Sequence, residues 1–355
     1  MTTREGWTSV RLSATAAAFW AALLSCAAGA TAAARVEVQP RPKERRVVVR
    51  VDGQPFTDYI WPERLRKPVL YPLRTAKGTI VTRGFPLEPR PGERVDHPHQ
   101  VGLWFNYGDV NGVDFWNNSE ALTAEEAARM GTIHHRAIVT SRSGAGRGEL
   151  EVALDWAMPD GSTVIREETR FVFQADARRR GVDRTTTLTA RGKRVVFADS
   201  KEGLLGLRVT RALEEPSKEP EVFIDASGRA TAVPVLDNTG VNGVYASSEG
   251  RRAGAVWGTR ARWVSLSGRV AKEDVVLLFL DHPSNPGHPT YWHARGYGLF
   301  AANPLGQKVF SNGKEELNFR LEAGASAIFR HRLLILQGPL PAEDAEAAWT
   351  KFVKE

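Results

Sequence analysis

The sequence predicts a mostly β protein with an antiparallel architecture. Three observations support this fold class: apolar residues at every second position, turn residues between these runs, and only two segments with a helical pattern. Val47, Val49 and Val51 show the alternation, and Asp52-Gly53 follows them as a turn signal. Many short strands separated by such turns are typical of a β-sandwich or of a larger antiparallel assembly.

Residues 1–34 are predicted to be a secretory signal peptide rather than part of the fold. Arg4 and Arg11 give a basic start, the sequence then runs to residue 34 without a charge and is rich in Ala and Leu, and Arg35 begins polar sequence. This order is that of a cleaved export signal, so we expect a periplasmic or secreted protein. The alternatives are a transmembrane anchor, which the length of the apolar run allows, and an outer-membrane lipoprotein attached through Cys26.

The mature chain, residues 35–355, is predicted to be a single domain held together by its core. Cys26 is the only cysteine, so no disulfide is expected in the mature chain. No linker divides the sequence, and no later segment is long and apolar enough to span a bilayer. The formal net charge is +7, with 48 Lys and Arg interspersed among 41 Asp and Glu. This favours anionic ligands weakly and gives no basic patch for nucleic acid.

Strand patterns recur along the mature chain and begin around Val36 and Val38. Further runs with apolar or alternating residues are 148–156, 165–173, 182–189, 194–198, 204–209, 251–258, 263–266, 275–280, 297–301, 317–321 and 327–336. Two helices are expected. The first covers 121–130 after a cap at Ser119 or Thr123, and the second covers 341–353, where Pro341 opens an acidic first turn.

The densest candidate site is the segment 96–118. It combines imidazoles, which carry protons near neutral pH, with amides and carboxylates that bind hydroxyls and aromatic rings that stack on sugars. We expect His97 and His99 to be catalytic. The expected substrate-binding residues are Trp104, Asn106, Asp109, Asn111, Asp114 and Trp116. Asp109 and Asp114 could also supply two-carboxylate glycosidase chemistry. The alternative is that the aromatic residues are core and that Asn and Asp form turns.

A second candidate segment, 281–297, follows a very apolar strand. We expect His293 to be the catalytic partner of the first segment and Arg295 to hold a hydroxyl, carboxylate or sulfate. Asp281, His282 and Trp292 complete the expected substrate-binding residues of this segment. An ordered surface loop is the alternative. Elsewhere, Lys201 and Glu202 form either an acid/base or sugar-binding pair or an exposed turn.

No organic cofactor is expected, because the sequence lacks a phosphate-binding glycine loop, a dinucleotide fingerprint and a nucleophile elbow. A divalent metal is an alternative. His97 and His99 share a face on an extended segment, and Asp281, His282 or His293 could complete such a ligand set.

Several motifs together resemble the DUF6807 family, over nearly the whole mature chain. They are Pro68–Pro72, Thr82-Arg83-Gly84, Asp96-His97-Pro98-His99, Gly102–Phe105, Gly108–Gly112, Lys201-Glu202-Gly203, Trp257-Gly258-Thr259-Arg260, Asp281-His282-Pro283 and Tyr291–Gly298. Members often carry His-His-Arg-Gly where this chain has His99-Gln100-Val101-Gly102. The family is often labelled as the methane oxygenase subunit PmoA, but that subunit is built from transmembrane helices, which this mature sequence does not predict.

The resemblance implies a β-supersandwich similar to those of aldose mutarotases and of some polysaccharide lyases. Together with the candidate segments, it predicts an exported carbohydrate-active protein that acts on oligo- or polysaccharides from plants, algae or other sources, including anionic ones. A glycoside hydrolase or lyase is the leading expectation, with an epimerase beside it. The alternatives are a non-catalytic carbohydrate-binding protein and a metal-dependent oxidoreductase.

Overall fold

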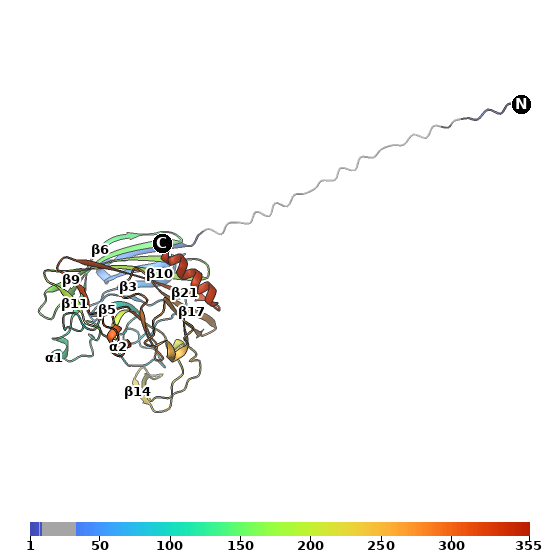
Figure 1. The fold of residues 1–355 in the computed structure, drawn as a ribbon. Helices are drawn as coiled ribbons and strands as arrows, with labels where there is room; N and C mark the ends of the chain where they lie inside the picture. The colour runs from blue at the N-terminus through green and yellow to red at the C-terminus, as the bar shows by residue number, and fades with distance from the viewer. Residues whose placement is uncertain (7, 9–32) are drawn as a thin grey trace. The chain divides into compact units, whose positions relative to one another are not determined.

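The computed structural model describes residues 1–6, 8 and 33–355, and residues 33–355 form one compact unit (Figure 1). Most of the predicted signal peptide, including Cys26, lies outside the described residues. Within the described part of the chain, no helix is long and apolar enough to cross a membrane.

The first of two large sheets has nine antiparallel strands in the order β18-β19-β12-β5-β4-β3-β2-β1-β7. Their bounds are Arg35–Arg41 (β1), Arg46–Val51 (β2), Gln54–Ile60 (β3), Val69–Tyr71 (β4), Leu103–Tyr107 (β5), Gly144–Ala145 (β7), Gly203–Arg208 (β12), Tyr291–Arg295 (β18) and Leu299–Asn303 (β19). Strands β1 to β5 are sequential neighbours, whereas β12, β18 and β19 join the same sheet from late in the chain. This crossover brings the two candidate segments together.

The second sheet has eight antiparallel strands in the order β15-β16-β17-β21-β10-β9-β8-β6. Their bounds are Thr132–Arg142 (β6), Arg147–Ala157 (β8), Thr163–Ala175 (β9), Arg179–Ala190 (β10), Val244–Ser247 (β15), Trp263–Val270 (β16), Glu273–Asp281 (β17) and Ser326–Gln337 (β21). Most predicted strands fall on these elements to within a few residues. The exception is 251–258, which forms no strand and contains the 3-10 helix Ala253–Val256.

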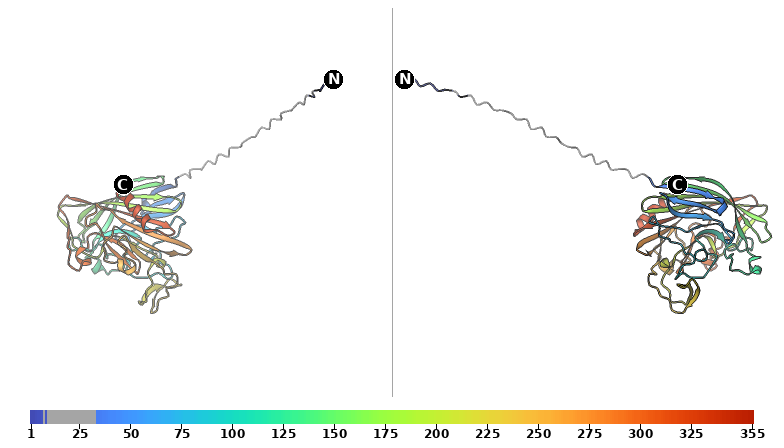
Figure 2. Two further views of the ribbon diagram at one scale, coloured as in Figure 1. Left: turned by 45° about the vertical axis from the view of Figure 1, so that its right-hand side comes forward. Right: turned by 180° about the vertical axis from the view of Figure 1, so that it is seen from behind.

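Two small sheets and a few helices complete the unit. The small sheets pair Val195–Phe197 (β11) with Phe319–Leu321 (β20) and Glu221–Ile224 (β13) with Ala230–Val233 (β14), and the second pair forms a hairpin that extends from the body (Figure 2). The α-helices are Ala124–Ala127 (α1), Gln307–Phe310 (α2) and Ala342–Val353 (α3), and further 3-10 helices are Pro42–Glu44 and Arg211–Leu213. Helix α1 is shorter than expected and begins at a Thr123 capping box.

The core lies between the two large sheets. Phe105 on β5 meets Phe329 on β21 with ring centroids 6.0 Å apart, and Phe56 on β3 meets Phe173 on β9 at 6.2 Å. These inward side chains alternate with outward ones, because successive strand residues point to opposite faces. The predicted antiparallel β-supersandwich is therefore confirmed.

Helix α3 covers part of the outer face of the eight-stranded sheet. Ala345 and Phe352 pack with Leu278, Leu280 and Leu334 in an apolar cluster separate from the inter-sheet core. The predicted C-terminal helix is confirmed, and its burial against the sheet explains why a short helix is stable here.

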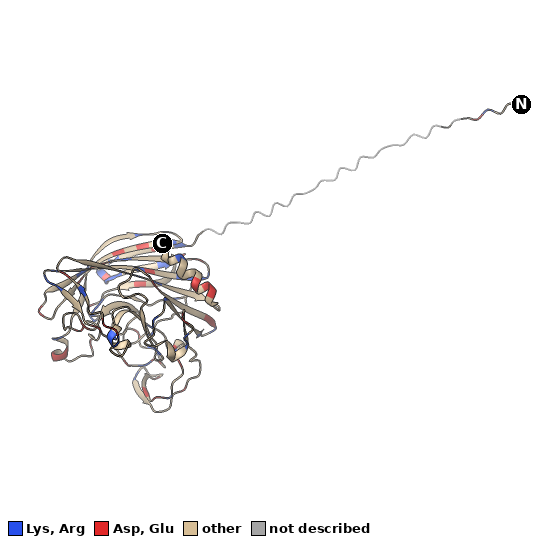
Figure 3. Cartoon of the chain, viewed as in Figure 1, with Lys and Arg blue, Asp and Glu red and all other residues tan. Residues whose placement is uncertain are grey.

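The rest of that outer face carries charges of both signs (Figure 3). Asp155 on β8 pairs with Arg166 on β9 at 2.7 Å, and Glu149 pairs with Arg170 at 2.7 Å. Exposed pairs of this kind contribute little stability, typically about 0–1 kcal/mol each. Their alternation along the strands agrees with the interspersed charges of the sequence and marks a solvated surface.

Candidate functional site

A row of facing residues crosses the outer face of the nine-stranded sheet. His293 on β18 pairs with Ala301 on β19, Ala301 with Gly206 on β12, and Gly206 with Trp104 on β5. The row ends on β4, where Val69 pairs with Trp104. Gly206 is required here, because an added Cβ would lie 2.5 Å from the Trp104 indole. Gly206 thus makes room for the Trp104 indole on this face of the sheet.

A pocket of about 230 Å³ lies beside this row, and we call it the central pocket. It is lined by His97, His99, Gln100, Asn117, Lys201, Glu202, His293, Arg295 and Tyr297. The lining comes from the loops before β5 and after it, from the turn before β12 and from β18 with the turn that follows it. The structure thus brings together His97, His99, Lys201, Glu202, His293 and Arg295, all expected to be functional from the sequence.

His97 is held by a charged network. Its Nδ1 donates to Asp96 Oδ2 at 2.6 Å, and both Arg83 and Arg208 lie 2.6 Å from Asp96 Oδ1. Burial disfavours the ionised Asp96 carboxylate, but the hydrogen bond from His97 and the charges of both arginines outweigh burial and hold its pKa well below its usual range. The His97 ring also stacks on Tyr297, with centroids 5.0 Å apart. This fixes the ring while its side chain stays 41% exposed.

His293 is oriented by the chain itself. Its Nδ1 donates to the carbonyl oxygen of Lys201 at 2.9 Å, which leaves Nε2 as the basic nitrogen of the neutral ring. Burial lowers the pKa of His293 to about 4, so the imidazole is neutral at neutral pH. No described residue forms a hydrogen bond with Nε2. His293 is therefore a preoriented base that lines the pocket.

His99 lines the pocket but differs from the other two histidines. The residue is only 8% exposed, and its Nε2 is buried without a partner among the described residues. Burial, followed by the positive charge of Lys67, lowers the pKa of His99 far below its ordinary value. The imidazole stays neutral, and its buried Nε2 is less open to the pocket than the exposed ring of His97, so its expected catalytic role stays a prediction.

Aromatic and charged groups form the rim. Arg295 lies over the ring of Trp257 at 5.3 Å and over that of Tyr297 at 5.8 Å. Trp257 is 39% exposed, and its ring centroid is 6.4 Å from that of His293. Lys201 pairs with Glu202 at 3.2 Å on the same rim. These groups offer one open aromatic ring and several hydrogen-bonding groups to a ligand.

The expected stacking roles of three tryptophans are wrong. Trp104, Trp116 and Trp292 are all fully buried. Trp104 and Trp116 pack in an apolar cluster on the outer face of the nine-stranded sheet, and Trp292 belongs to the inter-sheet core, where its Nε1 donates to the carbonyl oxygen of Ala261. Since a sugar ring needs an exposed aromatic face, these side chains support the fold and not the ligand.

The polar residues after His99 also serve the backbone. Asp109 accepts from the Gly112 amide at 2.9 Å, and Asp114 accepts from the Trp116 amide at 2.7 Å, as turn carboxylates do. Asn111 accepts from the Val196 amide. Buried Asn106 donates to the carbonyl oxygen of Phe115. None of these four expected substrate-binding residues lines the central pocket, and the carboxylates of Asp109 and Asp114 do not face each other across it.

Asp281 and His282 belong to a different part of the molecule, which we call the loop cluster: Asp281, His282, Asn285, His288 and His331. Asp281 is fully buried and accepts from Asn285 at 2.7 Å and from His288 Nδ1 at 2.7 Å. The His282 ring packs edge-on against Phe352 of α3. The expected substrate-binding roles of Asp281 and His282 are therefore wrong.

Of the residues suggested for a divalent metal, Asp281 and His282 lie in the loop cluster, whereas His97, His99 and His293 line the central pocket. Among the described residues, no group of three or more His, Cys, Asp and Glu side chains is arranged to hold a metal ion.

Sequence reasoning missed Asp96, Gln100, Asn117, Trp257 and Tyr297 at this site. Trp257 and Tyr297 both lie in motifs that carry the family resemblance, which was the available signal. Their burial and orientation could not be inferred from those motifs, because each depends on contacts with distant segments.

A family model described as a family of unknown function, DUF6807, matches residues 46–350. A search of curated protein sequences finds no match. Among solved structures, the galactosidase domain of an alpha-galactosidase-sucrose kinase is similar, with 9% identity and a TM-score of 0.39 over 85% of this chain and 42% of that one. The chain thus spans less than half of that longer protein.

Two epimerase structures match over nearly their whole length. A putative aldose 1-epimerase from Escherichia coli K12 has 11% identity and a TM-score of 0.31 over 86% of this chain and 99% of that one. A galactose 1-epimerase from Lactobacillus acidophilus NCFM has 8% identity and a TM-score of 0.34 over 86% and 98%. At these identities the likeness concerns the arrangement of strands and assigns no ligand or reaction.

Proposed function

We propose that this chain, which belongs to the DUF6807 family, is a carbohydrate-active enzyme that moves protons on a sugar bound in the central pocket. The observation that carries the proposal is the convergence of His97 and His293 from distant segments on one pocket, each with Nδ1 engaged in a hydrogen bond. Ring tautomer and orientation are fixed in this way at sites of acid–base catalysis.

The two histidines have distinct roles. Neutral His293 accepts a proton from the sugar at Nε2, and His97, whose Nδ1 is paired with the ionised Asp96, delivers a proton to the departing or ring oxygen. Such a pair serves elimination or epimerisation. Among the described residues, Glu202 is the single carboxylate that lines the pocket, which makes a two-carboxylate hydrolysis the weaker reading.

Substrate binding uses the rim. The exposed Trp257 ring stacks on the apolar face of a sugar, and Arg295 and Glu202 bind hydroxyl groups. The same rim suits a non-catalytic carbohydrate-binding protein. The two functions differ in whether His293 is needed for binding or for turnover, which makes it the residue to test.

The proposal includes export. A basic start, an uncharged Ala-rich stretch and small residues before Arg35 support cleavage of residues 1–34 and a periplasmic or secreted mature protein. N-terminal sequencing of the protein purified from its native cells checks this point. A mature chain that begins near Arg35 supports export, whereas a lipidated Cys26 indicates membrane attachment instead.

The function is tested by turnover of an oligosaccharide and uronic acid panel with His293→Gln. We expect turnover to fall about 10²–10⁴-fold, the usual contribution of a general base, while the rise in melting temperature on sugar binding persists. His134→Gln, at an exposed histidine on β6, is the matched control and keeps wild-type turnover. Wild-type turnover by His293→Gln would refute the proton-transfer role, and sugar binding without any turnover by the wild type would indicate a binding protein.

A further inference from the structure

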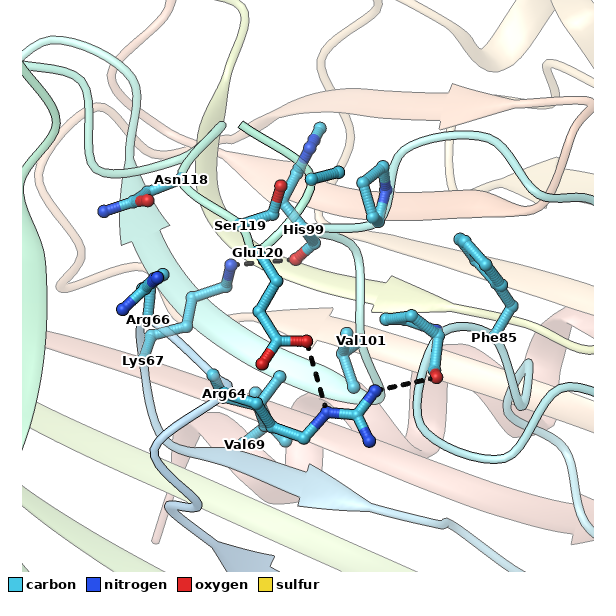
Figure 4. A pocket seen from close by; sticks show the side chains of 14 residues that line it. Arg64, Arg66, Lys67, Val69, Phe85, His99, Val101, Asn118, Ser119 and Glu120 are labelled. Atoms are coloured by element: carbon cyan, nitrogen blue, oxygen red, sulfur yellow. Dashed lines mark hydrogen bonds and ion pairs between the residues drawn. The ribbon is translucent and has the colours of Figure 1, made fainter. Parts of the chain in front are cut away.

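A second cavity of about 230 Å³ adjoins the central pocket, and His99 lines both. We call it the lysine pocket, after Lys67, whose amine reaches into it (Figure 4). The cavity is lined by Arg64, Leu65, Arg66, Lys67, Val69, Phe85, Pro86, Pro98, His99, Val101, Asn118, Ser119, Glu120 and Ala121. The proposed reaction uses none of the side chains that line this cavity.

Lys67 is an unusual feature of this cavity. The residue is 4% exposed, and among the described residues its amine makes one hydrogen bond, to the carbonyl oxygen of His99 at 2.8 Å, and no ion pair. Burial lowers the pKa of Lys67 to about 7, with a small opposing effect from the charge of Asp114. The amine also lies 5.8 Å from the centroid of the Trp104 ring, so it has a carbonyl and an aromatic contact but no carboxylate. A buried ammonium without a counter-ion is costly, so proteins pair such groups with carboxylates or ligands.

Three buried polar atoms on residues that line this cavity lack partners among the described residues. They are Arg66 Nε, His99 Nε2 and Asn118 Oδ1, and His99 and Asn118 are 8% and 3% exposed. Such atoms are uncommon in folded proteins and call for an explanation. An imidazole nitrogen and an amide oxygen are suited to sugar hydroxyls, which both donate and accept hydrogen bonds.

The charges around Lys67 favour an anion. Arg64 and Arg66 line the cavity with Lys67, and Glu120 is its only lining carboxylate among the described residues. Glu120 lies 3.5 Å from Arg64 at the exposed rim and forms no ion pair with Lys67 (Figure 4). His99 is held neutral by burial, so the cavity has an excess of positive charge.

We propose that the lysine pocket is a subsite for the carboxylate of an acidic sugar, with the remainder of the sugar chain in the central pocket. The inference rests on the proposed function for its central pocket and specifies the substrate class as uronic-acid-containing sugars. The carboxylate supplies the counter-ion that Lys67 lacks, and neighbouring hydroxyls reach His99 and Asn118. The competing explanation is structural: Lys67 only anchors the loop that carries His99.

The test compares D-glucuronate with D-glucose, which lacks the carboxylate, and with acetate, which lacks the sugar. In the wild type, we expect glucuronate to raise the melting temperature more than glucose at equal concentration. Lys67→Met removes the charge and keeps most of the apolar stem, and it should lower glucuronate affinity at least tenfold while leaving glucose affinity unchanged. Lys193→Met, at an exposed lysine in the turn after β10 and outside both pockets, is the matched control.

Calorimetry of the wild type supplies a readout that does not depend on folding of the variant. Binding of an anion favours the protonated amine, so glucuronate binding should take up a proton near pH 8, and its affinity should fall as the pH rises above 7. The other titratable groups that line the cavity are Arg64, Arg66, His99 and Glu120. Equal affinity for glucuronate and glucose, or glucuronate binding with no proton uptake, would overturn the proposal.

The outcomes also separate this subsite from the proposed function. Sugar turnover that depends on His293 but shows no preference for acidic sugars would leave the function standing and overturn the subsite. Glucuronate binding that depends on Lys67, without turnover of any sugar, would support the subsite and refute the enzyme. Acetate binding as tight as that of glucuronate would identify a site for simple carboxylates and overturn the sugar assignment.

Discussion

The central pocket and the loop cluster contain similar types of residue, but these side chains line a cavity in the first region and hold the fold together in the second. Both combine histidines with an aspartate, and both come from segments that begin with Asp-His-Pro in the sequence. In the loop cluster, Asp281 accepts from Asn285, His288 and the Thr290 amide, and its carbonyl oxygen accepts from Trp349 Nε1. This aspartate ties the loop after β17 to helix α3.

In the central pocket, the same types of residue are oriented by one hydrogen bond each and otherwise open to a ligand. His293 donates through Nδ1 and His97 pairs with Asp96, but no described residue forms a hydrogen bond with the second ring nitrogen of either. The comparison teaches that a dense histidine motif does not by itself locate a site. Histidines that are oriented by hydrogen bonds and also line a cavity do, whereas the unpaired Nδ1 of His331 in the loop cluster is buried in the fold.

The largest expected difference is in stability. Asp281→Ala leaves the buried groups of His288, Asn285 and Thr290 without their acceptor, and we expect the free energy of unfolding to fall by about 3 kcal/mol or more. Urea unfolding measures this loss. Glu202→Gln in the central pocket should cost less than about 1 kcal/mol, because it alters only a partly exposed pair at the rim. Equal losses would remove the distinction between the two regions.

A second expected effect, the dependence of stability on pH, is common to both regions and therefore does not distinguish them. Burial lowers the pKa of His331 and of His293 to about 4, below the ordinary 6.5. Protons then bind to the unfolded chain first, so stability is full above pH 6.5 and falls as the pH drops toward 4. Each histidine contributes about 1.4 kcal/mol per pH unit in this range.

Denaturant unfolding at several pH values checks this slope. His331→Gln and His293→Gln should each reduce it by about one proton. A slope that neither substitution changes would show that these two rings titrate in the folded protein as they do in the unfolded chain.

The smallest expected effect is that of the exposed Trp257, and the buried Trp104 is its structural contrast. Trp257→Ala should lower sugar affinity about fivefold to tenfold, the value of one aromatic contact, with little change in melting temperature. Trp104→Ala removes a fully buried indole and should destabilise the fold by about 3–5 kcal/mol. Calorimetric titration with an oligosaccharide measures the sugar affinity, and the melting temperature reports the loss of stability. An unchanged affinity in Trp257→Ala would remove Trp257 from the binding surface.

The sequence predicted the fold well because strand alternation is local. Runs such as 165–173 and 327–336 fall within β9 and β21, and the capping residue Thr123 begins α1 as expected. The run 251–258 was predicted wrongly because it forms a 3-10 helix, of which Val256 alone is buried. Apolar composition alone does not separate these two conformations.

The candidate site was predicted only in part, because the surroundings of its residues depend on contacts between distant segments. Residue type identified His97 and His293. Trp104 was wrongly expected to bind substrate because it is buried, and Asp109 because its carboxylate accepts a hydrogen bond within a turn. Lys67 gave no signal at all, because its position beside His99 follows from the pairing of β4 with β5. Properties that depend on neighbours distant in the chain cannot be inferred from local pattern.

Proton NMR of a sugar panel incubated in D2O tests the central claim most directly, because it detects deuterium incorporation, exchange between anomers, new olefinic signals and bond cleavage. The account predicts such a change with the wild type and with His282→Gln in the loop cluster. It predicts none with the His97→Ala, His293→Ala double variant. Conversion by the double variant at the wild-type rate, or sugar spectra that the wild type leaves unchanged, would contradict it.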